Sequence, residues 1–228
     1  MARTKVASEP AYRRIVAEPG VYKPQEDSWL LCEELGKSQL AHDSRVLDIC
    51  TGSGIIAIEA ARLGAREVLA LDIADRAIDC TRRNAARAGV RVNARVGSFD
   101  DAAALEPFDV LLANPPYVPS GAPPEGKGIQ RAWDAGSDGR SVLDPLCESA
   151  AALLAPGGTI MLVQSEFAAP ERTLLTLKRC GFEVGVVASR TIPFGPVLTD
   201  YAERLEATGR LEPGRRTEEL VVIRADRQ

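Results

Sequence analysis

Apolar runs of strand length alternate with helical patterns along this chain from Arg45 onward. The predicted strands span residues 45–50, 67–71, 91–96, 109–113 and 159–163, and most of them have the composition of strands buried on both faces. The predicted helices between them span residues 55–63, 75–88 and 141–154, and a loop at 155–158 ends the last. This alternation predicts an α/β fold with a doubly wound, mostly parallel sheet covered on both faces.

The remaining C-terminal pattern completes a seven-stranded sheet of the Rossmann-like kind. A helix is expected around 171–179, a strand at 183–189, and a last, antiparallel strand at 219–225. The chain has 228 residues, of which 45% are hydrophobic and 26% charged, and it shows no internal repeat or linker. We therefore expect one domain over residues 1–228, with a short N-terminal segment of about residues 1–24 leading into it.

Charge and hydropathy narrow the classes of partner. The formal net charge is -4, which gives no overall attraction to nucleic acid or to an anionic membrane surface. The most apolar stretches are strand-length, and the N-terminus carries no apolar signal core. We expect a cytoplasmic protein that does not bind membranes.

Cysteine and histidine usage argues against metal and triad chemistry. No two of the five cysteines form a CxxC pair, so they are interpreted as reduced core thiols; they are Cys32, Cys50, Cys80, Cys147 and Cys180. The single histidine, His42, precedes a predicted strand and is expected to be a solvated turn residue. Serine–histidine, cysteine–histidine and histidine–metal sites are thereby disfavoured, and no metal is expected.

A glycine-containing loop connects the first predicted strand to its helix. The loop runs from Asp48 through Cys50, Thr51 and Gly52 to Gly54, and its glycines allow a ligand to approach the backbone at a helix N-terminus. Asp72 ends the next strand, where a carboxylate can accept hydrogen bonds from both ribose hydroxyls of a nucleoside. Together these features predict an adenosine-containing ligand at the switch point of the sheet, rather than a turn whose glycines only permit packing.

The choice between a dinucleotide and S-adenosylmethionine depends on Asp48. A carboxylate there would face a pyrophosphate unfavourably, whereas the sulfonium and amino groups of S-adenosylmethionine are cationic. Ser98, at the end of the third strand, lies where a contact to the adenine edge is expected, although an ordinary strand end is an equal alternative. The sequence therefore favours S-adenosylmethionine.

The sequence Asn114-Pro115-Pro116-Tyr117 directly follows the fourth predicted strand. The prolines fix the backbone and donate no N–H, so they leave a rigid group of acceptors beside an aromatic ring. The Asn114 side-chain oxygen and the Pro115 carbonyl suit the two protons of a planar NH2 group, with Tyr117 packed on its plane. This arrangement predicts catalysis by positioning of a nitrogen nucleophile. The irregular stretch 119–139 that follows is expected to be a lid or disordered.

With these motifs the chain resembles class I S-adenosylmethionine-dependent methyltransferases of the HemK family, which act on glutamine in peptide-chain release factors. Residues 21–28 resemble the P-x-E-D-S/T segment of the short branch in eukaryotes and archaea, and residues 133–140 and 219–224 resemble its lid and last strand. The resemblance implies cofactor contacts at Ser28, Asp48, the 50–54 loop, Asp72, Ser98, Phe99 and Asn114.

Two residues depart from the family pattern. Cys50 replaces the first glycine of the loop, which we expect to require negative φ and room for a side chain. Ser98 replaces a usual aspartate, so Asp100 is an alternative contact for the adenine amino group. The helical N-terminal domain of bacterial members has no counterpart in the sequence. The short branch works with a small zinc-binding activator, which leaves open whether this chain has one.

Four other functions compete with glutamine methylation. The same acceptor group fits a protein lysine, a small-molecule amine or the exocyclic amine of adenine in nucleic acid, although the net charge disfavours the last. A non-catalytic binding module with this fold is the alternative of another class. The acceptor, the oligomeric state and the need for an activator are not encoded in these motifs.

Overall fold

A seven-stranded sheet organises the computed structural model, which describes residues 11–120 and 128–228. The strand order is β3-β2-β1-β4-β5-β7-β6. The strands β1 to β5 pair in parallel, and β7 is antiparallel to both neighbours, β5 and β6, as the sequence predicts. The strands are β1 (Arg45–Ile49), β2 (Glu67–Asp72), β3 (Asn93–Val96), β4 (Phe108–Ala113), β5 (Leu154–Ser165), β6 (Phe182–Pro193) and β7 (Thr217–Arg227).

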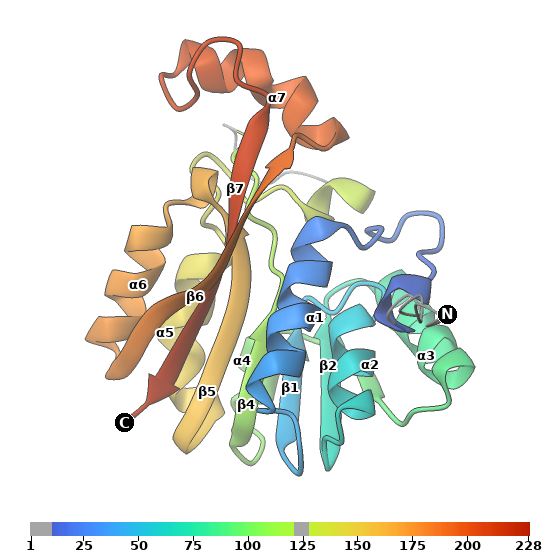
Figure 1. Ribbon diagram of the computed structural model, residues 1–228. Helices are drawn as coiled ribbons and strands as arrows, with labels where there is room; N and C mark the ends of the chain where they lie inside the picture. The colour runs from blue at the N-terminus through green and yellow to red at the C-terminus, as the bar shows by residue number, and fades with distance from the viewer. Residues whose placement is uncertain (1–10, 121–127) are drawn as a thin grey trace, which may run out of the picture.

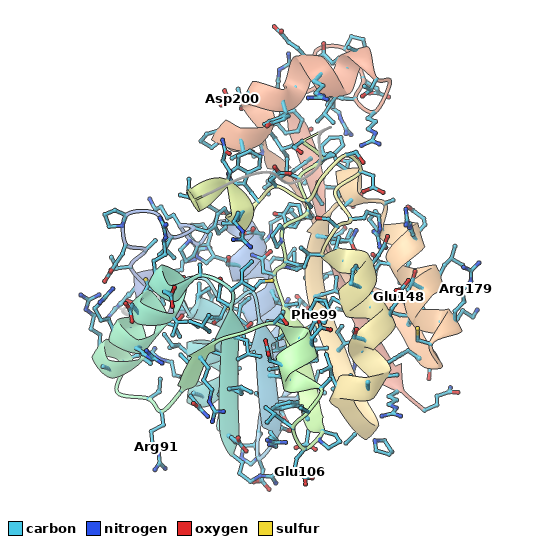
Figure 2. The ribbon with its side chains drawn as sticks, turned by 180° about the vertical axis from the view of Figure 1, so that it is seen from behind. Arg91, Phe99, Glu106, Glu148, Arg179 and Asp200 are labelled. Atoms are coloured by element: carbon cyan, nitrogen blue, oxygen red, sulfur yellow. The ribbon has the colours of Figure 1, made fainter. Side chains whose placement is uncertain are left out.

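Helices cover both faces of the sheet (Figures 1 and 2). Helices α1, α2 and α3 lie on one face, and α4, α5 and α6 lie on the other. Helix α7, between β6 and β7, stands beyond the end of the sheet at the top of Figure 1. The helices are η1 (Ala11–Arg14), α1 (Glu26–Ser38), α2 (Ile55–Arg62), α3 (Asp75–Ala88), α4 (Phe99–Ala102), η2 (Gly128–Ala132), α5 (Leu143–Leu153), η3 (Glu166–Ala168), α6 (Pro170–Arg179) and α7 (Pro196–Ala207).

The central strands form the core because helices exclude water from both of their faces. Val46 and Leu47 in β1 and Leu111 and Leu112 in β4 are fully buried. This confirms the interpretation of those runs as two-sided strands. The edge strands β3 and β6 differ, because most of their side chains keep contact with solvent.

Some elements differ from the sequence expectations. Helices α1, α4 and α7 were not predicted, because α1 begins within a motif interpreted by its chemistry, α4 has one turn, and α7 begins at Pro196, shortly after Pro193. Residues 155–158, expected as a loop, belong to the irregular start of β5, where the register against β4 shifts. A bulge or register shift leaves little trace in a hydrophobic pattern.

The strand order reverses between β1 and β4, which are neighbours in the sheet. In open α/β sheets a crevice forms at such a point, beyond the carboxyl ends of the strands. The loops that follow β1, β2, β3 and β4 all leave from this edge. The glycine loop and the Asn114-Pro115-Pro116-Tyr117 sequence therefore meet there, which locates the candidate site.

Candidate functional site

A cavity of about 770 Å³ lies at the carboxyl ends of β1, β2, β3 and β4. This volume is within the range of small-molecule and cofactor sites. Most of the residues that the sequence assigns to the cofactor line it, namely Ser28, Cys50, Thr51, Gly52, Asp72, Ser98, Phe99 and Asn114. Asp48 and Gly54 do not line it.

Asp48 lies beneath the glycine loop and braces it. The carboxylate is fully buried, and its Oδ2 accepts hydrogen bonds from Thr51 Oγ1 at 2.6 Å and from the Ala57 backbone N–H at 3.1 Å. Within the described part of the chain, Asp48 Oδ1 has no hydrogen-bond partner. Desolvation raises the pKa of this carboxyl to about 7. Asp48 thus orders the loop from below and places a carboxyl group behind the cavity.

The raised pKa of Asp48 makes folding stability depend on pH. The unfolded carboxyl ionises near 3.8 and the folded one near 7, so the unfolded state binds fewer protons between these values. The contribution of Asp48 is therefore fully present below pH 3.8 and is lost as pH rises to about 7. Urea unfolding of the wild type and of Asp48→Asn across this range should show stability falling by a few kcal/mol more in the wild type. Parallel curves would contradict the assignment.

Gly54 is required by packing at the start of α2. Its φ is +83°, and a Cβ there would lie 2.7 Å from Thr81 Cγ2. The close approach seats helix α3 against the loop, and Thr81 Oγ1 donates to the Gly52 carbonyl at 3.1 Å. Gly54 therefore shapes the loop from outside the cavity lining.

Cys50 adopts a conformation opposite to the sequence expectation. Its φ is +59°, in the left-handed region that favours glycine, whereas a negative φ was expected. The next residue explains this: the Thr51 backbone N–H donates to the Leu71 carbonyl at 3.1 Å, which ties the loop to the end of β2. The loop keeps its glycine geometry and Cys50 carries the strain.

Replacing Cys50 by glycine tests that strain. A left-handed L-residue costs about 1–2 kcal/mol, and glycine loses about 0.4–1 kcal/mol through the unfolded chain. We expect the free energy of unfolding of Cys50→Gly to lie within about 1 kcal/mol of the wild-type value. The variant should retain activity, because the cysteine is structural. Cys50→Val, β-branched at the same φ, is the comparison that should be clearly destabilised in urea. An activity loss in Cys50→Gly would assign the thiol a functional role.

Asp72 lines the cavity at the end of β2. Its Oδ2 accepts from the Gly52 backbone N–H at 3.0 Å and its Oδ1 from the Ala74 backbone N–H at 3.0 Å. Desolvation raises the pKa of this carboxyl, and the backbone donors oppose the shift. The side chain is partly exposed, so its oxygens retain acceptor capacity toward the cavity.

Ser98 and Phe99 lie at the start of α4, on the adjacent part of the lining. The Ser98 hydroxyl caps this helix: it accepts from the Asp100 backbone N–H at 3.2 Å, and it donates to Asp101 Oδ2 at 3.2 Å. Asp100 is exposed and does not line the cavity. The local geometry therefore gives the hydroxyl a structural role, and Phe99 supplies the apolar surface.

A second cavity of about 150 Å³ lies on the other side of Asn114. Pro115, Pro116 and Tyr117 line it, and Asn114 and Pro116 line both cavities. Asn114 Nδ2 donates to Ser28 Oγ at 3.2 Å, which fixes the orientation of the amide. The structure thus brings the Asn114-Pro115-Pro116-Tyr117 sequence and Ser28 together at the wall between the two cavities.

Asp27 connects the site and was not selected from the sequence as a site residue. It is 3% exposed and accepts four hydrogen bonds: from the Ser28 backbone N–H and hydroxyl on Oδ1, and from the Tyr22 and Tyr117 hydroxyls on Oδ2. Burial and Asp27 raise the pKa of both tyrosines, so both remain donors. Its place between Glu26 and Ser28 in the motif is the signal that could have identified it.

The segment expected to be a lid contributes to both cavities in its described part. Ile129 and Arg131 line the larger cavity, Trp133 lines the smaller one, and Ala132 lines both. Trp133 also meets Tyr201 of α7 edge to face, with ring centroids 5.7 Å apart. The expectation for residues 121–127 lies outside the described residues.

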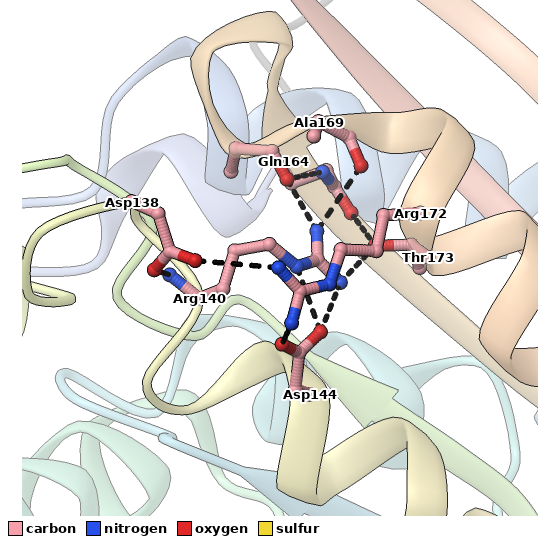
Figure 3. Close-up of polar contacts among 8 residues, drawn as sticks. Asp138, Arg140, Asp144, Gln164, Ala169, Arg172 and Thr173 are labelled. Carbon is pink, nitrogen blue, oxygen red and sulfur yellow. Dashed lines mark hydrogen bonds and ion pairs between the residues drawn. The ribbon is translucent and has the colours of Figure 1, made fainter.

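Arg140 anchors the C-terminal end of this segment (Figure 3). The guanidinium is 2% exposed and donates to Asp144, to the Ala168 and Ala169 carbonyls, and to Thr173. The guanidinium N–H groups therefore point at protein oxygens, which compensates the buried charge. Arg140 therefore joins the segment to α5 and α6.

The structure agrees with the sequence interpretation for the histidine and for three of the five cysteines as core residues, whereas Cys50 and Cys180 are only partly buried. All five cysteines are free, and Cys32, Cys80 and Cys147 are buried. His42 is exposed in the turn before β1. Within residues 11–120 and 128–228, no three His, Cys, Asp or Glu side chains are placed to share a metal ion, and no helix is long and apolar enough to cross a membrane.

The fold and the site define a class I methyltransferase. The family model of ribosomal protein L11 methyltransferase (PrmA) matches residues 30–115. The Encephalitozoon cuniculi Mtq2–Trm112 complex, described as responsible for methylation of the eRF1 translation termination factor, superposes with a TM-score of 0.63 at 22% identity. The match covers 92% of this chain and 99% of that chain.

Sequence relatives then specify the family. A putative protein N5-glutamine methyltransferase of Methanocaldococcus jannaschii is 32% identical over 84% of this chain and 96% of its own length. The release factor glutamine methyltransferase of Deinococcus radiodurans is 38% identical over 60% of this chain and 51% of its own length, so this chain matches about half of that relative. The chain belongs to the HemK family of protein glutamine methyltransferases.

Proposed function

We propose that this methyltransferase transfers a methyl group from S-adenosylmethionine to the side-chain amide nitrogen of a glutamine in a protein, and that the acceptor is a peptide-chain release factor. The observation that carries the proposal is the position of Asn114 between two cavities of very different size. The names of the relatives support the same acceptor.

The larger cavity fits S-adenosylmethionine. A Cβ at Gly52 would meet only the Cys50 carbonyl oxygen, at 4.0 Å, so a ligand can approach the backbone there. Asp72 presents carboxyl oxygens for the ribose, and Phe99 supplies an apolar surface for the adenine. Asp72 presents a carboxyl group at this end of the cavity, and Asp48 lies beneath the loop behind it, so acidic groups on this side suit a cationic ligand. When bound, the cofactor supplies the electrophilic methyl group.

The smaller cavity fits one side chain. A cavity of 150 Å³ holds a benzene-sized group, which is smaller than a nucleobase. This size favours a protein side chain over adenine in nucleic acid. The Asn114 Oδ1 and the Pro115 carbonyl are acceptors for the two N–H of an amide, and Ser28 keeps Asn114 from rotating.

These residues act by orientation. An amide nitrogen is a weak nucleophile because its lone pair is delocalised into the carbonyl. Holding both N–H groups directs the lone pair out of the amide plane and toward the larger cavity. No base is needed before the attack, and the proton released afterwards passes to an acceptor of the site or to water.

Incubation with labelled S-adenosylmethionine and a purified release factor tests the proposal. We expect label on one glutamine, found by peptide mass mapping, and none on a release factor with that glutamine replaced. Label on a lysine or on RNA would contradict the amide assignment. A small activator subunit is proposed as a further requirement, because Mtq2 is described in complex with a second protein, Trm112. The assay therefore includes arms with and without such a subunit.

Asp72→Ala tests the cofactor assignment. A charge-assisted hydrogen bond contributes about 1.5–3 kcal/mol where it is desolvated, and Asp72 also orders Gly52 and Ala74. We expect calorimetry to show S-adenosylmethionine binding weakened at least tenfold in a folded variant. Unchanged affinity would place the ribose elsewhere, and no binding to the wild type would support a non-catalytic module.

A further inference from the structure

Three acidic side chains line the smaller cavity. Glu26, Asp27 and Glu218 line it, and no lysine or arginine of the described chain does. Two of the three are satisfied within the protein. Asp27 accepts four hydrogen bonds, and Glu26 pairs with Arg190 at 3.1 Å.

Glu218 is the exception. It lies near the start of β7, where it pairs with Ile192 of β6, and it is 5% exposed. A hydrogen bond with the Ser165 side chain engages its carboxyl group, but Oε2 has no partner within the described residues. Leaving a buried carboxylate oxygen unpaired is costly, so such an oxygen calls for an explanation.

The surroundings of Glu218 disfavour its charge when the cavity is empty. Burial raises the pKa of this carboxyl to about 7, and Asp27 and Glu166 add to the shift. Glu218 in turn contributes to the raised pKa of Tyr22 and Tyr117. A hydrogen-bond donor entering the cavity would relieve this repulsion, whereas an anion would increase it.

We propose that Glu218 is a second acceptor-binding residue, whose Oε2 accepts a hydrogen bond from an N–H of the substrate that Asn114 and Pro115 leave free. This inference rests on the proposed function for the location of the acceptor, and it adds a residue from β7. An amide NH2 has two protons, and both are assigned to Asn114 and Pro115. The remaining donor is then a main-chain N–H beside the acceptor glutamine, or the third N–H of a lysine ammonium.

Trp133 allows binding to be measured without methyl transfer. It lines the same cavity, and the only other tryptophan, Trp29, lies on α1 against Arg13. In a Trp29→Phe background, the fluorescence of Trp133 reports occupation of the cavity. The neighbouring Glu219 is exposed on the opposite face of β7, so Glu219→Gln is a matched control.

The experiment titrates N-acetylglutamine methylamide, N-acetyllysine methylamide and propionamide into the Trp29→Phe protein, alone and with Glu218→Gln or Glu219→Gln. We expect Glu218→Gln to weaken binding of the glutamine derivative about tenfold. Binding of propionamide, which lacks the main-chain N–H, should be unchanged. Glu219→Gln should leave all three unchanged. Thermal unfolding and S-adenosylmethionine calorimetry check that each variant is folded.

The outcomes separate this inference from the proposed function. Weakening of the lysine derivative alone would keep Glu218 as an acceptor-binding residue and would contradict glutamine as the substrate. Equal binding by Glu218→Gln and the wild type, or no binding of any of the three compounds by the wild type, would overturn the inference. Binding that depends on Glu218, together with no methyl transfer to a release factor, would leave it standing while the proposed acceptor fails.

Discussion

Asn114→Ala should abolish methyl transfer while leaving cofactor affinity within a few fold of the wild type. Removing one preorganised polar group that acts on the reacting atoms typically lowers turnover about a hundred- to a thousandfold. Most of the larger cavity is lined by other loops, so S-adenosylmethionine should still bind. Turnover is measured with labelled cofactor and the acceptor, and affinity by calorimetry.

Two variants sharpen this result. Asn93→Ala, an exposed asparagine on edge strand β3, should behave like the wild type in both assays. Asn114→Asp should be less damaged with an amine acceptor, whose protonated form a carboxylate can hold, than with a neutral amide. Near-wild-type turnover in Asn114→Ala would remove the basis for positioning catalysis at this residue.

Asp27→Asn should have the second largest effect, on stability and turnover together. The substitution converts one accepting oxygen into an NH2 donor, so either Ser28 or the two tyrosines lose their partner. Breaking a buried, hydrogen-bonded charge in this way costs about 3–5 kcal/mol. We expect urea unfolding to show a loss of that size, and turnover to fall at least tenfold because Ser28 no longer holds Asn114.

Variants that each remove one hydrogen bond separate the effect of Asp27 on stability from its effect on turnover. Tyr22→Phe and Tyr117→Phe each remove one hydroxyl donor, and each should cost about 1–2 kcal/mol of stability. Ser28→Ala removes the link to Asn114, so it should lower turnover more than stability. If Asp27→Asn were as stable as the wild type, the four hydrogen bonds described for Asp27 would not hold in solution.

The sequence predicts the sheet better than the site. The order of strands and helices from β1 to α3 follows from hydrophobic periodicity, and α3 matches its predicted residues 75–88. Loop chemistry correctly brings Gly52, Asp72 and Asn114 to one cavity. These residues are close because parallel strands expose their carboxyl ends at one edge, which is a rule of topology.

The contacts that sequence reasoning missed depend on long-range packing. Glu218 and Asp27 come from distant parts of the sequence and interact electrostatically, which no local pattern encodes. The positive φ of Cys50 follows from its loop being tied to Leu71. Asp48 was assigned to the cofactor by its charge, yet its depth in the sheet directs it to Thr51 and Ala57. Burial decides each of these cases, and burial requires the folded structure.

The wall between the two cavities belongs to both of them. Tyr22, Asn114, Pro116 and Ala132 line each side, so a ligand that orders these side chains from one cavity pays part of the ordering cost for the other. Such coupling is reciprocal: whatever factor the cofactor adds to acceptor affinity, the acceptor adds to cofactor affinity. Shared side chains thus make the two substrates thermodynamically linked, and the methylated product and the spent cofactor should each loosen as the other departs.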